Sequence, residues 1–169
     1  AERGYRLLNG LNARKHELLG IKEDQTAFEL FKQLFSNEME LALRSFESFS
    51  FTRNWQYLAN FRRSQTNLRS LLTFFSPLIE QASHAINHVR AINSILDNLC
   101  GWWPEKNALS NVDKTLENSI EKWCEQQAIE KADMLLEHLV FSQHLLQLGA
   151  WLYRVDVVTT HASLNVAEF

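Results

Sequence analysis

Glycine and proline are scarce in this chain. Residues 21–100 contain no glycine and a single proline, Pro77, and all 169 residues hold only 5 glycines and 2 prolines. Because these residues provide most tight turns and sheet corners, their scarcity argues against a fold of many short strands. We therefore predict an all-α fold: an antiparallel helical bundle of four to six helices, forming a single domain over residues 1–169.

The chain also lacks long apolar runs and a strong charge of either sign. No stretch approaches the ~18–20 apolar residues of a membrane span, so we predict no span within this chain. The net charge is −3 and the pI is about 6.1. A protein that grips nucleic acid is usually strongly basic, so we do not expect nucleic acid as a partner.

Cysteine is scarce as well. The two cysteines, Cys100 and Cys124, could form one disulfide in an oxidising compartment or stay reduced in the cytosol. The sequence leaves both states open. The chain begins with Ala1 rather than methionine, so we expect that a preceding segment was removed, from a secreted protein or from a larger one.

Apolar residues at helical spacing are abundant. The 11 phenylalanines and many leucines recur at steps of three and four residues, which predicts helices around a Phe/Leu-rich core. We expect a break or bend at 48–52, a loop at 102–109 and a soft boundary near Gln126. Ser76 and Pro77 indicate either a helix that restarts there, with Ser76 as its cap, or a kink. We also expect a capping box over 110–113. The predicted helices cover about residues 1–20, 24–47, 52–75, 78–100, 111–126 and 129–152.

Two histidines have the spacing of metal ligands. Glu80, His84 and His88 follow one another at steps of four residues and share one helix face. That face lies beside the apolar stripe rather than on it, so we interpret the histidines as surface or boundary residues and predict no cofactor. If a metal were bound, a third ligand would come from a later helix; the candidates are Glu137, His138 and His144.

Charge is segregated along the chain, with arginines in the middle and acidic residues after residue 112. Arg62, Arg63 and Arg69 could form an anion-binding face, because guanidinium groups suit carboxylate and phosphate. Pairing between helices of one bundle is the alternative, and both remain open. As a partner-binding surface we predict an acidic stripe and an aromatic pair, which could instead cover the core. These residues are Glu117, Glu121, Glu125, Trp102 and Trp103.

Motifs of known catalytic chemistry are largely missing. The sequence has no phosphate loop, no dinucleotide fingerprint and no nucleophile elbow, and neither cysteine has the setting of a nucleophile. Arg154 and His161 have a spacing that resembles the Arg-His motif of the helical HEPN ribonucleases, in which both residues flank the scissile phosphate. Val155 departs from that motif, where a polar residue usually follows the arginine.

The stretch Glu2–Gly10 reads ERGYRLLNG. It resembles the Arg-Gly-Tyr-Leu-Leu-x-Gly segment near the start of some extracytoplasmic helical sensor domains of bacterial histidine kinases. The resemblance covers nine residues and includes a one-residue insertion. It implies a sensor function and favours an extracytoplasmic location over the cytoplasm.

From these features we expect a non-enzymatic regulatory module, most simply a helical sensor domain of a signalling receptor. It would bind a small anion or a protein partner, and it could form a homodimer. The alternative is a cytosolic adaptor, chaperone or immunity-type protein, which reduced cysteines and an exposed tryptophan pair would favour. A metal-dependent hydrolase or a HEPN-like ribonuclease is the third hypothesis.

Overall fold

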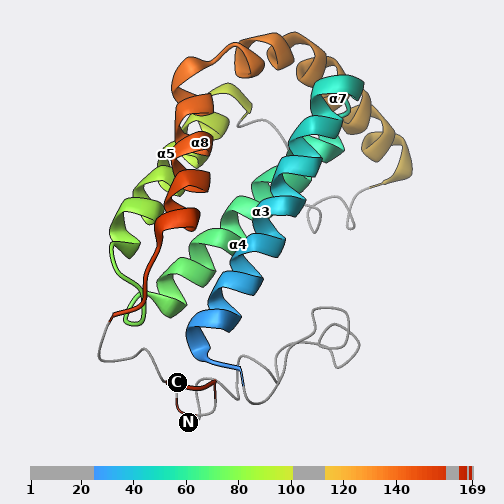
Figure 1. Cartoon of the computed structure of the whole chain (residues 1–169). Helices are drawn as coiled ribbons and strands as arrows, with labels where there is room; N and C mark the ends of the chain where they lie inside the picture. Colours follow the sequence, from blue (N-terminus) through green and yellow to red (C-terminus); the bar gives the residue numbers. More distant parts are fainter. Residues whose placement is uncertain (1–24, 101–112, 159–163, 167, 169) are drawn as a thin grey trace.

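The computed structural model describes residues 25–100, 113–158, 164–166 and 168. The predicted helix in residues 1–20, the pair Trp102 and Trp103, and His161 lie outside these ranges. Within them, the all-α prediction is confirmed, since no β-strand occurs and only isolated bridges are present. The described helices are α3 (Ala27–Thr52), α4 (Trp55–Phe75), α5 (Ala82–Cys100), α7 (Lys114–Leu136) and α8 (Leu139–Arg154) (Figure 1).

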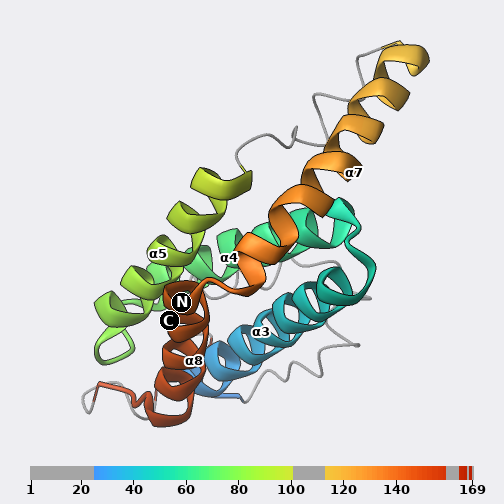
Figure 2. The same ribbon diagram turned by 90° about the horizontal axis from the view of Figure 1, so that it is seen from above.

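Four of these helices form an antiparallel bundle. The chain runs up α3, down α4, up α5 and down α8, so that each helix is antiparallel to the one it packs against most extensively (Figure 1). α7 crosses the end of the bundle where α3 gives way to α4, and its N-terminal half extends beyond the other helices (Figure 2). No helix in the described part of the chain is both long and apolar enough to span a membrane.

Aromatic rings dominate the core, as the composition predicts. Two clusters lie along the bundle. In one, Phe31 contacts Phe35, Phe75 and Trp151 with ring centroids 5.4–6.2 Å apart. The other cluster, at the opposite end, comprises Phe46, Phe49, Phe61 and Phe141. Burying aromatic rings in this number is the main source of stability for such a bundle.

The start and the end of α3 follow from local hydrogen bonds. Thr26 and Glu29 form a capping box at its N-terminus. The break or bend predicted at 48–52 occurs slightly later, because the helix continues to Thr52 before Arg53 adopts a left-handed conformation with φ 57°. The hydroxyls of Ser50 and Thr52 bond to carbonyls three and four residues earlier, so they are satisfied inside the helix.

The connection between α4 and α5 is longer than predicted. The expected helix restart at Pro77 is wrong, because a turn occupies 76–81 and α5 begins at Ala82. The Ser76 hydroxyl donates backward to the carbonyl of Thr73 and does not cap a following helix. Leu78 and Ile79, both buried, anchor this turn in the core.

The break in the last third of the chain lies later than predicted. α7 runs through Gln126 to Leu136, and the chain bends at residues 137–138 instead. A single buried face of α7 spans the expected boundary: Cys124, Ala128, Ala132 and Leu135. Three residues of the expected capping box, 110–112, lie outside the described ranges; its fourth, Asp113, is the N-cap of α7 and accepts from the Thr115 amide.

Candidate functional site

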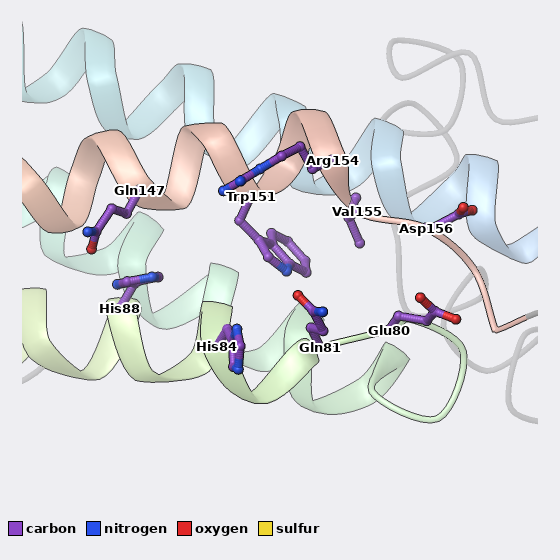
Figure 3. A pocket seen from close by; sticks show the side chains of 9 residues that line it. All are labelled: Glu80, Gln81, His84, His88, Gln147, Trp151, Arg154, Val155 and Asp156. Carbon is purple, nitrogen blue, oxygen red and sulfur yellow. The ribbon is translucent and has the colours of Figure 1, made fainter.

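A pocket of about 490 Å³ lies between the beginning of α5 and the end of α8 (Figure 3). This volume falls within the ~300–1,000 Å³ that small-molecule sites usually occupy. Two imidazoles, two amides, a guanidinium and two carboxylates surround an indole ring. The lining residues are Glu80, Gln81, His84, His88, Gln147, Trp151, Arg154, Val155 and Asp156.

One end of the pocket is held by backbone pairing between the turn before α5 and the segment after α8. Ile79 and Val157 form an antiparallel bridge, and the Glu80 amide donates to the carbonyl of Asp156 at 3.0 Å. The Asp156 carboxylate accepts from the Val157 amide at 2.8 Å. The exposed side chains of Glu80 and Asp156 therefore start from neighbouring backbone and lie at the same end of the pocket (Figure 3).

Gln81 lines the pocket in an unfavourable backbone conformation. Its φ is 55°, the left-handed region that side-chain-bearing residues rarely adopt. Such conformations cost about 1–3 kcal/mol and cluster at functional sites. The carbonyl of Gln81 accepts from the amide of His84 at 3.0 Å, which places both side chains along the same wall of the pocket (Figure 3).

α8 supplies the opposite wall from three residues at helical spacing. Gln147, Trp151 and Arg154 share one face of the helix. Trp151 is buried and rests against Phe31 and Phe35, so the indole forms a rigid floor. The Arg154 guanidinium points back along α8 toward Gln147 (Figure 3), and its Nε donates to the carbonyl of Ala150. Among the described residues, no carboxylate lies within ion-pair distance of Arg154.

Two histidines meet beside the pocket. Nδ1 of His88 on α5 lies 3.0 Å from Nδ1 of His144 on α8. For a hydrogen bond, one of these nitrogens must donate its N–H and the other must accept through a free lone pair. The contact therefore requires at least one neutral imidazole. Burial lowers the pKa of His88 below its ordinary value of 6.5, and the nearby His144 and His84 lower it further. His88 is therefore neutral at physiological pH.

We expect mild acid to destabilise the fold through His88. The unfolded chain protonates this imidazole near pH 6.5, whereas the folded chain does so only at lower pH. Over that interval the unfolded state binds more protons, so the free energy of unfolding falls as the pH falls from 6.5 through the folded pKa. Thermal melts between about pH 7.5 and about pH 5 would measure the loss.

The matched control for this titration is His88→Gln, which is neutral at every pH. We expect its melting temperature to fall less between the same pH values than that of the wild type. Well above pH 6.5 His88 is neutral in both the folded and the unfolded state, so the two slopes should agree there. Equal slopes below pH 6.5 would contradict the assignment to His88.

The histidines and the glutamate that the sequence singled out do come together. Glu80, His84 and His88 all line the pocket, with His84 exposed and His88 half-buried. Of the three proposed third metal ligands, only His144 contacts this cluster, through His88. His138 caps α8 by accepting from the Phe141 amide, and Glu137 is the exposed C-cap of α7. Within the described ranges, no three histidine, cysteine or acidic side chains are placed to hold a metal.

The arginines on α4 are partly engaged in ion pairs. Arg62 pairs with Asp97 of α5 at 2.6 Å, while Arg63 and Arg69 are exposed. Pairing between helices also joins Arg53 to Asp133 of α7 at 3.0 Å. The alternative of charge pairing within the bundle therefore holds for Arg62 and Arg53, and an anion site at Arg62, Arg63 and Arg69 stays a prediction.

The acidic stripe lies on α7, where Glu117 and Glu121 are half-buried and Glu125 is exposed. Its role as a partner surface also stays a prediction. Nearby, Cys124 is a buried free thiol, and burial together with Glu121 raises its pKa above the ordinary value. A raised pKa keeps the sulfur protonated and unreactive, which agrees with the lack of a nucleophile's setting in the sequence.

The sequence did not single out the α8 side of the pocket. Gln147, Trp151 and Asp156 were not considered as site residues, and Arg154 was considered only with His161. A local signal does exist: a glutamine, a tryptophan and an arginine share one helix face near the C-terminus of α8. Comparisons with protein families, curated proteins and solved structures found no match.

Proposed function

We propose that this chain is a non-enzymatic regulatory module that binds a small anionic ligand in the pocket between α5 and α8. The supporting observation is the Arg154 guanidinium, which lines that pocket and has no carboxylate partner among the described residues. An arginine fork suits carboxylate and phosphate groups. The exposed imidazole of His84 and the amide of Gln147 add hydrogen-bond donors beside it.

Binding is favoured over catalysis by the chemistry of the lining. No serine, threonine or cysteine is among the nine described residues that line the pocket. The more buried imidazole, His88, contacts another imidazole rather than a group that it could activate. The described lining therefore offers no hydroxyl or thiol nucleophile next to a base, whereas its guanidinium, amide and imidazole groups suit the recognition of a charged ligand.

A sensor domain is the form of regulatory module that we favour, on the resemblance of Glu2–Gly10 to extracytoplasmic sensor domains. A cytosolic adaptor remains the alternative, and reduced cysteines in the purified protein would favour it. The two differ in what they bind. A sensor binds a small molecule in its pocket, whereas an adaptor presents a surface such as the acidic stripe of α7 to a protein.

Arg154→Gln is expected to weaken anion binding by about tenfold or more, because it removes a charge-assisted hydrogen bond worth roughly 1.5–3 kcal/mol. Isothermal titration calorimetry with acetate, hexanoate, phosphate and sulfate would measure the change. The matched control is Arg90→Gln, an exposed arginine of α5 outside the pocket, which should bind like the wild type.

The double variant Arg63→Gln/Arg69→Gln tests the site predicted on α4. If this double variant loses anion binding while Arg154→Gln still binds anions, the pocket is the wrong site and the arginines of α4 bind the anion. If wild-type protein binds none of these anions, the binding function itself is contradicted. Turnover of RNA by the wild type, abolished in Arg154→Gln, would instead favour the HEPN-like hypothesis.

A further inference from the structure

We propose that the ligand of this pocket is an elongated zwitterion, with an acidic group at one end and a cationic amine at the other. This inference rests on the proposed function, in which Arg154 receives the acidic group. It adds the second half of the ligand, for which Glu80 and Asp156 form the receiving end (Figure 3).

The two ends of the pocket carry opposite charge. The Arg154 guanidinium extends toward Gln147 and His88, while Glu80 and Asp156 lie together at the far end (Figure 3). Neither carboxylate has a cationic side chain within ion-pair distance among the described residues. Glu80, Asp156 and Arg154 are exposed, so water solvates their charges and none of them requires a partner. A simple anion would gain attraction from Arg154 alone, and a simple amine would gain it from the two carboxylates alone. A ligand that carries both charges complements both ends.

The backbone fixes the acidic end independently of any ligand. The bridge between Ile79 and Val157 and the bond from the Glu80 amide to the Asp156 carbonyl hold the backbone of Glu80 and Asp156 together. The Asp156 carboxylate is also oriented, because one of its oxygens accepts from the Val157 amide. A backbone that is already held in this arrangement needs no reordering when a ligand binds, which reduces the entropic cost of binding.

The wall that α5 contributes gives an approximate scale for the ligand. This wall extends from the start of the helix at Ala82 as far as His88, a stretch of about 9 Å along a helix that rises 1.5 Å per residue. The middle of the pocket is lined by the indole of Trp151 and by Val155 (Figure 3), which suits an aliphatic chain. An α-amino acid that holds its charges on one carbon is too short to reach both ends, whereas an ω-amino acid with a chain of several methylenes is long enough.

The test measures the binding of three probes to the full chain. Each probe has six carbon atoms: 6-aminohexanoate, which carries both charges, hexanoate and hexylamine. We expect calorimetry to give 6-aminohexanoate an affinity at least about tenfold above that of hexanoate, since each satisfied charge is worth about that factor. Hexylamine should bind weakly, and glycine, a zwitterion too short for both ends, should bind no better than hexanoate.

The double variant Glu80→Gln/Asp156→Asn removes the acidic end. Asparagine keeps an oxygen that can accept from the Val157 amide, and Glu80 and Asp156 are exposed, so the fold should be retained. We expect 6-aminohexanoate to bind this variant about tenfold more weakly than it binds the wild type. Hexanoate should bind the variant at least as tightly as it binds the wild type. Arg154→Gln should weaken the binding of both acids.

The outcomes separate this inference from the function on which it rests. Suppose that hexanoate binds the wild type as tightly as 6-aminohexanoate does, and that Arg154→Gln weakens the binding of hexanoate. In that case the pocket is an anion site, and the proposal of a zwitterionic ligand is wrong. The same conclusion follows if the double variant leaves the affinity for 6-aminohexanoate unchanged. If neither acid binds, or if Arg154→Gln changes neither affinity, both proposals fail.

Discussion

Replacing Phe31 with alanine is expected to lower the free energy of unfolding by about 3–5 kcal/mol, the usual cost of deleting a buried phenylalanine ring. Phe31 is fully buried on α3. Its ring contacts Phe75 of α4 and Trp151 of α8, so the cavity would open where three helices meet. Urea denaturation followed by circular dichroism would measure the loss.

Phe51 provides the matched control on the same helix. Its side chain is 81% exposed near the end of α3, so Phe51→Ala should change the free energy of unfolding by no more than about 0.5 kcal/mol. Phe31→Ala should also weaken ligand binding, because Trp151 loses the ring that supports it as the pocket floor. A loss of stability no greater than that of Phe51→Ala would show that the core is not packed as described.

Replacing Gln65 with methionine is expected to raise the free energy of unfolding by about 1–3 kcal/mol, the typical desolvation cost of a buried polar group left without a partner. Gln65 lies fully buried in α4. Within the part of the chain that the structure describes, neither its amide nitrogen nor its amide oxygen has a hydrogen-bond partner. Methionine has a similar volume and shape and no strong polar group, so it removes the penalty without creating a cavity.

Gln56→Met, at an exposed position in the first turn of the same helix, controls for helix propensity and should be close to neutral. Chemical denaturation of both variants gives the comparison. If Gln65→Met destabilises the protein while Gln56→Met does not, the Gln65 amide makes favourable bonds in solution, and the desolvation argument does not apply to it.

The fold class follows from local sequence, but several helix boundaries do not. Scarce glycine and proline and apolar residues at steps of three and four suffice to predict helices around a phenylalanine-rich core. Serine and threonine are ambiguous, because their hydroxyls can cap a following helix or bond backward into the preceding one. Ser50, Thr52 and Ser76 all bond backward, so the breaks predicted around them are displaced.

The candidate site depends on contacts between residues distant in sequence. His84 and His88 stand out by their spacing, but the pocket exists only because α8 returns beside α5 with Trp151 and Arg154. The same limit applies to the arginines of α4. Whether Arg62 binds an external anion or pairs with Asp97, thirty-five positions later, depends on the packing of α4 against α5, and charge spacing alone does not determine that packing.

The face that α7 packs against the bundle contains Cys124, whose reactivity can report whether that face is exposed. The sulfur of Cys124 is inaccessible while that face is packed, so a thiol-modifying reagent can reach it only after α7 has separated from its neighbours. In a Cys100→Ser background, the rate of Cys124 modification would measure how often this helix detaches without complete unfolding. The opening of one helix could thus be timed in solution without an attached label.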